Sequence, residues 1–216
     1  MGIHELARQK YRLHAPWYDS VAAPLLGASY QREAVSLLHL GAGDVVVDVA
    51  CGTGINFPLI EQGIAHTGHL IGVDVSPEML REAHIRVVSH GWTNVTLINA
   101  PAEEAQIHQT VDAFLFSFAH DVLQSPRALR NLFQHARRGA RVAACGIKWA
   151  PWWSFPSNLF VFQIAQQYHV VHEGLSKPWG HLTAFVSNLE IRLMAFETIY
   201  MACGTVTGGV NNRVRD

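Results

Sequence analysis

Apolar and polar residues follow one another along this chain in a pattern that predicts strands separated by helices. Continuous apolar runs rich in β-branched residues fit strands that are buried on both faces, as in a parallel sheet. The first such run stands at residues 45–49, and further strands are predicted at residues 70–73, 94–99, 111–117 and 141–147. Helices are predicted between them, at residues 57–62, from residue 76 onward and at residues 125–135. This order predicts an α/β fold with a doubly wound sheet and helices on both of its faces.

The segments on either side of this core are less regular. Further helices are expected at residues 3–13, 30–40, 160–172 and 178–189. The last two strands are expected within residues 191–206, joined by a tight connection at residues 195–197. The stretch at residues 137–140 contains a glycine and predicts a turn before the fifth strand. With 216 residues, 49% of them hydrophobic, the chain is long enough for one domain with a large core.

The first strand runs directly into a glycine turn, Cys51-Gly52-Thr53-Gly54. Two glycines one residue apart let the backbone turn tightly and let a ligand approach the main chain. An apolar segment follows, and Pro58 limits the start of its helix to the first turn. A strand, a glycine turn and a helix form the ligand-binding corner of a doubly wound sheet.

Two kinds of cofactor compete for this corner. A dinucleotide fingerprint needs a third glycine where Phe57 stands, and Asp48 inside the strand would repel a pyrophosphate. Asp48 would instead accept a hydrogen bond from an ammonium group, directly or through water. The second strand ends in Asp74, an acid placed to hold both hydroxyls of a ribose. A ribose and an amino acid without phosphate describe S-adenosylmethionine.

The motif D-V-A-C-G-T-G at residues 48–54, followed by G-V-D-V-S-P-E-M-L at residues 72–80, resembles the class I S-adenosylmethionine-dependent methyltransferases. The nearest branch is the quinone-biosynthesis and phospholipid methyltransferase-like group. The resemblance covers residues 44–146, is weak before them and is faint after them. It implies a Rossmann-like sheet of seven strands, mostly parallel with the last strand antiparallel.

The resemblance also implies which residues hold the cofactor. Tyr18 would close over it as part of a lid, Met79 would neighbour the adenine, and an Ala-Glu pair would read the adenine edge. Pro101 stands where the family has an aspartate, so the contact to the adenine amino group is in doubt. The full predicted set is Tyr18, Asp48, Ala50, Cys51, Gly52, Gly54, Asn56, Asp74, Val75, Met79, Ala102, Glu103 and Ser117.

One methyltransferase domain is predicted over residues 1–216. Its parts are an N-terminal helical lid at residues 1–40, a cofactor-binding core at 41–147, an aromatic-rich substrate cap at 148–189 and the final strands at 190–207. His120 follows the fourth strand, at the edge where ligands bind, and is the candidate catalytic base. Its alternative role is that of a packed or cofactor-contacting histidine.

Aromatic residues gather after the fifth strand, where this fold usually covers the substrate pocket. The candidate substrate-contacting residues are Trp149, Trp152, Trp153, His169 and His172. An aromatic, charge-poor cap suggests an apolar or aromatic substrate. The alternatives are that it only covers the sheet edge, or that it makes a peripheral membrane contact. The two histidines share a helix face and could bind a metal, but no metal site is predicted.

The charge balance, the apolar runs and the cysteines of the chain indicate which partners and which cellular location to expect. With 16 basic and 17 acidic residues and no basic run, the chain is not expected to bind nucleic acid. The polar start of the chain predicts no signal peptide, and no apolar run is long enough to span a bilayer. The three scattered cysteines predict reduced thiols and a cytoplasmic protein. The oligomeric state stays open, with a homodimer as one option.

The leading hypothesis is therefore methyl transfer to a small lipophilic or aromatic acceptor, with a quinone-like or phenolic acceptor favoured. A phospholipid head-group N-methyltransferase and a non-catalytic S-adenosylmethionine-binding module are the alternatives. An NAD-dependent oxidoreductase is disfavoured by Phe57 and Asp48. Because a sulfonium is already a good leaving group, such an enzyme mainly positions the acceptor and excludes water, and needs no universal catalytic residue.

Overall fold

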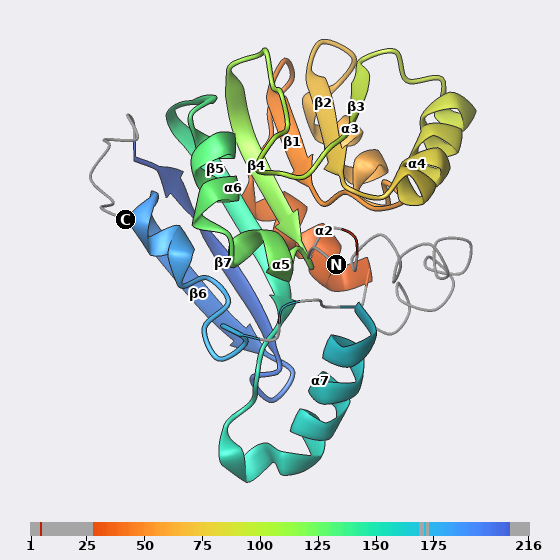
Figure 1. Cartoon of the computed structure of the whole chain (residues 1–216). Coiled ribbons are helices and arrows are strands. Elements are labelled where there is room, and N and C mark those ends of the chain that lie inside the picture. Colours follow the sequence, from red (N-terminus) through yellow and green to blue (C-terminus); the bar gives the residue numbers. More distant parts are fainter. Residues whose placement is uncertain (1–4, 6–27, 169–170, 172, 208–216) are drawn as a thin grey trace.

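A twisted seven-stranded sheet forms the centre of the molecule (Figure 1). The computed structural model of the chain describes residues 5, 28–168, 171 and 173–207. Within these residues the strand order is β3-β2-β1-β4-β5-β7-β6. The strands are β1 (Val45–Val49), β2 (His69–Asp74), β3 (Val95–Asn99), β4 (Val111–Ser117), β5 (Ala136–Ile147), β6 (Val186–Met194) and β7 (Ile199–Val206).

The direction of the strands confirms the predicted Rossmann-like sheet. Strand β1 pairs in parallel with β2 on one side and with β4 on the other, and β2–β3 and β4–β5 are parallel as well. Only β7 runs against its neighbours β5 and β6. The chain crosses from β3 back to β4, so the strand order reverses between β1 and β4. Ligands of doubly wound sheets bind at the carboxyl ends of the strands beside this reversal.

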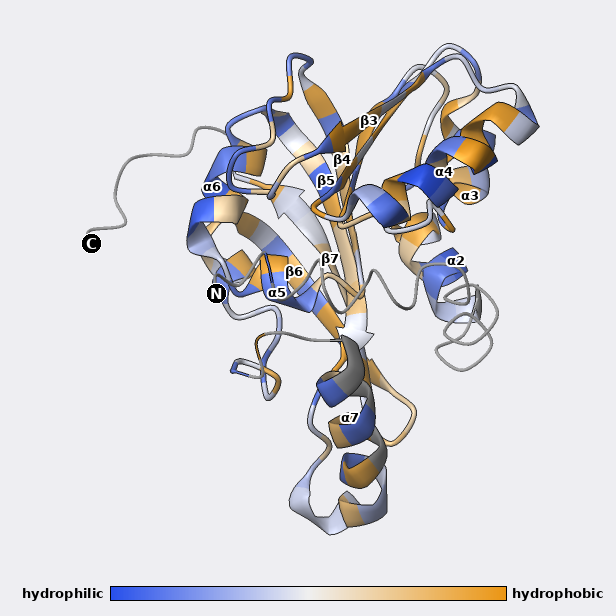
Figure 2. Cartoon of the chain, turned by 45° about the vertical axis from the view of Figure 1, so that its right-hand side comes forward, coloured by the Kyte–Doolittle hydropathy of each residue, from blue (hydrophilic) through white to orange (hydrophobic). Residues whose placement is uncertain are grey.

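Helices cover both faces of the sheet, as predicted. They are α2 (Ala28–Leu37), α3 (Phe57–Ile64), α4 (Pro77–His90), α5 (His120–Leu123), α6 (Pro126–Phe133) and α7 (Phe155–Tyr168), with short 3-10 helices η1 (Trp152–Ser154) and η2 (His181–Ala184). Alternate residues of the central strands serve opposite faces. Val47 and Phe114 pack with α5 and α6, whereas Val46 and Leu115 pack with α2, α3 and α4. The central strands are correspondingly apolar in Figure 2.

The predicted helix at residues 178–189 is wrong. The structure has only the single turn of η2 there, and β6 already begins at Val186. Exposed and partly buried residues alternate along β6, because this edge strand has one face on the core and one toward solvent. The predicted connection at residues 195–197 is confirmed. Ala195, Phe196 and Glu197 all have positive φ angles, which turn the chain tightly into β7.

Two other boundaries differ from the prediction. Residues 137–140 do not precede the fifth strand but form a bulge within it. Val111 pairs with Ala136 and Ala113 pairs with Arg141, so β5 holds the extra residues, and Gly139 has a φ of 77°. Helix α7 begins at Phe155, before the predicted residue 160, because the turn of η1 leads directly into it.

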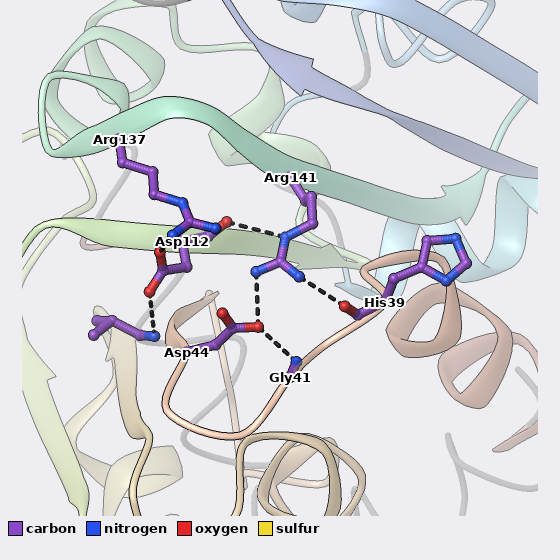
Figure 3. A network of polar contacts seen from close by, with 7 residues as sticks. His39, Gly41, Asp44, Asp112, Arg137 and Arg141 are labelled. Atoms are coloured by element: carbon purple, nitrogen blue, oxygen red, sulfur yellow. Dashed lines mark hydrogen bonds and ion pairs between the residues drawn. The ribbon is translucent and has the colours of Figure 1, made fainter.

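An arginine–aspartate network ties this bulge to the chain entering β1 (Figure 3). Arg141 donates to Asp44 and to the carbonyl of His39, each at 2.7 Å. Arg137 pairs with Asp112 at 2.7 Å, and Asp112 accepts from the first amide of β1 at 2.8 Å. This network lies at the amino ends of the strands, opposite the glycine turn. It therefore holds the framework and leaves the carboxyl ends for a ligand.

Candidate functional site

A cavity of about 850 Å³ opens at the carboxyl ends of β1, β2 and β4. This is the edge at which the sequence places the glycine turn, and it lies at the reversal of strand order. Several predicted cofactor-binding residues line it together with the candidate base. They are Ala50, Gly52, Asp74, Val75, Met79, Ala102, Glu103, Ser117 and His120.

The glycine turn exposes its backbone to this cavity. Ala50, Gly52 and Gly54 all have positive φ angles, of 54°, 55° and 72°. No heavy atom lies within 4 Å of the place where a Cβ of Gly52 would stand, so a ligand can approach the main chain there. Gly54 is different, because a Cβ on it would lie 2.7 Å from the ring of Phe57.

Phe57 takes the place that a third glycine has in a dinucleotide site. Its ring is fully buried and lies over both Gly54 and Gly72, where an added Cβ would come within 2.8 Å of it. Helix α3 therefore packs on the sheet through an aromatic ring over two glycines. The start of α3 is held away from the close backbone contact that a dinucleotide fingerprint requires.

Asp74 joins the glycine turn to the end of β2. One carboxylate oxygen accepts from the amide of Gly52 at 2.8 Å, and the other accepts from the amide of Ser76 at 2.8 Å. Burial raises the pKa of Asp74 above its usual value, and these backbone hydrogen bonds oppose that rise. The carboxylate is thus fixed in the cavity wall, beside the bare backbone of Gly52.

Asp48 lies deeper than predicted. It is fully buried, and its carboxylate accepts a hydrogen bond from the side chain of Asn56 at 3.2 Å. Burial raises the pKa of Asp48 from 3.8 to about 7, the Asn56 hydrogen bond opposes the rise and the charge of Asp74 adds to it. Asp48, Cys51, Gly54 and Asn56 are absent from the described lining of the cavity. They support the turn from below in this conformation.

On the predicted adenine side of the cavity, Ser125 and a side chain of α6 bind the loop that follows β3. Met79 is buried in the wall, near Ala102 and Glu103. Asn131 donates to the carbonyl of Ala102 at 2.9 Å, and Ser125 donates to the Glu103 carboxylate at 2.6 Å. Pro101 also lines the cavity. The loop after β3 is thereby held in a single shape against α6.

His120 is buried in the cavity wall, and its Nε2 lies 2.9 Å from the carbonyl oxygen of Glu173. A carbonyl can only accept, so Nε2 carries the proton and the basic lone pair of the neutral ring is on Nδ1. Asp121 in α5 and Gln124 just after α5 also form hydrogen bonds with the chain segment around Glu173. Asp121 accepts from the amide of Val171 at 3.0 Å, and Gln124 donates to the carbonyl of Pro178 at 3.0 Å.

These contacts hold residues 171 and 173–178, here called the strap, against α5 as one wall of the cavity. Val171, Glu173 and Gly174 of the strap line the cavity together with Asp121 and Gln124. Sequence reasoning missed the strap, Asp121 and Gln124. Their partners are about 50 residues apart along the chain, and the only local signal was the polar residues that follow His120.

The structure does not bring the candidate tryptophans to the cavity. Trp152 is 88% exposed and Trp153 is 59% exposed, while Trp149 packs beside the small apolar cluster around Val161. None of the three belongs to the described lining. Their assignment to the substrate site is therefore not supported by this conformation. Tyr18, His169 and His172 lie outside the described residues.

Two features are absent from the part of the chain that the structure describes. No group of three or more histidine, cysteine, aspartate or glutamate side chains there is placed to hold a metal ion. No helix there is long and apolar enough to cross a membrane.

Comparisons with known proteins agree with this geometry. Residues 46–141 match the methyltransferase domain family. A demethylmenaquinone methyltransferase from Symbiobacterium thermophilum is 32% identical over 143 residues, which make up 63% of this chain and 57% of that protein. A ubiquinone/menaquinone biosynthesis C-methyltransferase from Methylococcus capsulatus is 28% identical over 116 residues, 52% of this chain and 47% of that protein. The chain thus spans about half the length of the curated relatives it matches.

Solved structures share the fold over most of the chain. The N-methyltransferase NodS from Bradyrhizobium japonicum, solved with S-adenosyl-L-homocysteine, matches with a TM-score of 0.63 at 13% identity. The match covers 95% of this chain and 99% of that one. At this identity the likeness concerns the fold alone. The matched domain and the two relatives support a class I S-adenosylmethionine-dependent methyltransferase.

Proposed function

We propose that the chain binds S-adenosylmethionine in this cavity and transfers its methyl group to a small lipophilic or aromatic acceptor, quinone-like or phenolic. One observation carries the cofactor part of the proposal. The buried Asp74 carboxylate stands in the cavity wall at the end of β2, directly beside the open backbone of Gly52. An acid at this point of a doubly wound sheet takes ribose hydroxyls.

The residues present fit this cofactor. The cavity volume of about 850 Å³ is typical of small-molecule sites, which span roughly 300–1,000 Å³. Asp74 is available to the ribose, and Met79 and Ala102 supply an apolar wall for a flat base. Asp48 is a buried acid under the turn, and a hydrogen-bond donor such as the ammonium of an amino acid suits it better than a pyrophosphate.

The chain's own residues would position the two reactants. When bound, the cofactor supplies an activated methyl group on a sulfonium. Ser117, Phe118 and His120 line the cavity at the end of β4, where an acceptor would lie. The strap closes the wall beside them and limits access of water. His120, whose ring is fixed by the carbonyl of Glu173, is our candidate for the group that takes a proton from an acceptor hydroxyl.

The acceptor class rests on the lining and on the relatives. Apolar side chains such as Val75, Phe118 and Val122 share the lining with a few polar groups, which suits a largely apolar molecule. Two relatives are named as quinone-biosynthesis methyltransferases. We carry this acceptor class to the present chain as a proposal. A phospholipid head group and a non-catalytic cofactor-binding module are the alternatives.

A transfer assay separates these functions. The purified chain is incubated with methyl-labelled S-adenosylmethionine and, separately, with reduced short-chain quinones, simple phenols and phosphatidylethanolamine. We expect label in a quinol or phenol product that forms at a constant rate over many turnovers. Label in the phospholipid alone would support the head-group alternative. Cofactor binding without labelled product from any acceptor class would support the non-catalytic module.

A further inference from the structure

An uncharged aromatic segment projects from the body of the molecule. Residues 149–172 contain no Asp, Glu, Lys or Arg. Several of their large apolar side chains are well exposed, although large exposed apolar patches are uncommon on soluble proteins unless something binds them. The exposed set, here called the aromatic tip, is Trp152, Trp153, Phe155, Leu159 and Phe162.

Helix α7 has two apolar faces, one buried and one exposed. Val161 and Ala165 are buried and pack with the small cluster around Leu175, which attaches the helix to the body. Phe155, Leu159 and Phe162 recur at a spacing of four and three residues, so they share one face, and that face is exposed. Packing inside the chain explains the first face and leaves the second without a partner among the described residues.

The aromatic tip lies on elements that project from the body of the molecule (Figures 1 and 2). Figures 1 and 2 both show η1 and α7 extending from the end of the sheet, away from the helices that cover its faces. The turn between β6 and β7 lies at the same end of the sheet. Lys148, which follows β5, holds it there by donating a hydrogen bond to the carbonyl of Glu197 at 3.1 Å. Phe196 in that turn is 76% exposed. A projecting apolar end inserts into a deformable surface more readily than it fills a rigid groove.

We propose that the aromatic tip docks this protein on the surface of a lipid bilayer with neutral head groups. Tryptophan has an apolar ring and a polar N–H, and it is enriched where a membrane meets water. No residue of the aromatic tip is charged, so inserting these side chains dehydrates no ion. Lys148 and Glu197 stand beside it, at the turn between β6 and β7. The absence of basic side chains means that anionic lipids are not required.

The purpose of this docking rests on the proposed function, since a lipophilic acceptor would reside in the bilayer. Helix α7 has 14 residues and is therefore about 21 Å long. It runs from the exposed tryptophans toward Val171 and Glu173, which line the cavity. An acceptor entering along α7 would reach the strap and then the end of β4.

The test is binding of the full chain to vesicles of pure phosphatidylcholine, without cofactor or acceptor, measured by flotation and by tryptophan emission. We expect the wild type to bind, with affinity that changes little with salt, and the emission to shift to the blue. The double variant Trp152→Ser/Trp153→Ser should bind about tenfold or more weakly. The control Ile85→Ser/Val88→Ser removes two exposed apolar side chains from α4 and should bind as the wild type does.

Several results would overturn the proposal. They are a wild type that ignores phosphatidylcholine, a tryptophan variant that binds unchanged, or binding that needs anionic lipid and disappears in salt. A wild-type dimer that the tryptophan variant dissociates, without vesicle binding, would assign the aromatic tip to a second copy of the chain. Calorimetry with S-adenosylhomocysteine on the same proteins reports separately on the proposed function and on folding. We expect the same cofactor-product affinity in all three.

Discussion

At the scale of single residues, Asp74 carries the cofactor assignment. Asp74→Ala removes a carboxylate that also accepts two backbone hydrogen bonds, so affinity for S-adenosylhomocysteine should fall by about 10–100-fold, as expected for losing charge-assisted hydrogen bonds. Glu61→Gln is the matched control. Glu61 is also a buried acid with a raised pKa, but it binds Asn94 and is absent from the described lining of the cavity.

Isothermal calorimetry measures the affinity of both variants for S-adenosylhomocysteine. Unchanged affinity in Asp74→Ala, with an intact fold by circular dichroism, would remove Asp74 from the ribose site. An equal loss in both variants would show that the effect comes from a general disturbance of the sheet.

Asp48 predicts a pH-dependent stability. Its pKa is about 7 in the folded protein and near 3.8 in the unfolded chain, so between these values the folded state holds a proton that the unfolded state has lost. The unfolding free energy therefore falls as pH rises from about 4 to about 7, by up to ~4 kcal/mol for this group. Asp48→Asn has no such proton and should gain stability relative to the wild type over this range.

Urea denaturation at pH 5 and pH 8, without ligand, measures the effect. Asp74 has a raised pKa as well and is present in both proteins, but its charge interacts with that of Asp48, so the comparison reports the Asp48 proton together with this interaction. A stability difference between wild type and Asp48→Asn that is the same at both pH values would contradict a raised pKa for this acid.

His120 has one role that the structure shows, the hydrogen bond to Glu173, and one that we propose, that of a base. Glutamine can still donate to the carbonyl of Glu173, as the ring Nε2 does at 2.9 Å, but cannot act as a base near neutral pH. We predict that His120→Gln keeps the affinity for S-adenosylhomocysteine and loses about 10²–10⁴-fold in kcat with the acceptor found in the transfer assay. A glutamine variant with wild-type kcat, beside a slow alanine variant, would make His120 a positioning residue.

At the scale of elements, the strap depends on a glycine. Gly174 has a φ of 76°, and a Cβ there would meet the side-chain oxygen of Gln124 at 1.9 Å. Gly174→Ala should push Gln124 off the carbonyl of Pro178, which it now binds at 3.0 Å. Gly139→Ala is the control, because Gly139 has a φ of 77° and open space around it.

Both alanines carry the backbone strain of a positive φ, about 1 kcal/mol. Only Gly174→Ala should lose about 1 kcal/mol more, for the displaced hydrogen bond, and show faster amide exchange in the strap. Hydrogen exchange by mass spectrometry and urea denaturation measure the two effects. Strap protection that stays equal in the two variants would contradict the proposed clamp.

The elements that could be predicted from sequence are those whose burial leaves a clear pattern of apolar residues within the element itself. The central strands β1, β2 and β4 are buried on both faces along most of their length, so each appears as a largely apolar run. The first half of strand β6, before residue 191, was assigned to a helix because this strand lies at the edge, half exposed, and contains no such run. The alternation of Leu189, Ile191 and Leu193 with polar residues was the available signal for a strand.

The candidate site also has a part that could be predicted from sequence and a part that could not. The glycine turn and Asp74 are local motifs and could be placed from the sequence, whereas the strap depends on contacts between distant segments such as His120 with Glu173. The orientation of Trp152 and Trp153 could not be predicted either. An aromatic cluster has the same composition whether it faces a pocket or solvent, and only the course of η1 and α7 decides between them.

At the scale of the whole molecule, the sheet separates framework from site. The Arg141–Asp44 and Arg137–Asp112 pairs fasten the amino ends of the strands. The cavity occupies the carboxyl ends, and the aromatic tip extends beyond the end of β5 (Figure 1). The division into lid, core, cap and final strands remains a prediction, and residues 1–4 and 6–27 of the proposed lid lie outside the described residues.

The most direct measurement is calorimetric titration of the purified chain with S-adenosylhomocysteine and, separately, with NAD. We predict one binding site for S-adenosylhomocysteine and no binding of NAD, because Phe57 lies over Gly54 and Gly72 and Asp48 is buried beneath the turn. Binding of NAD without S-adenosylhomocysteine would contradict the central claim and turn the cavity into a dinucleotide site. If neither S-adenosylhomocysteine nor NAD binds, the proposed cofactor and the proposed methyl transfer would both be contradicted.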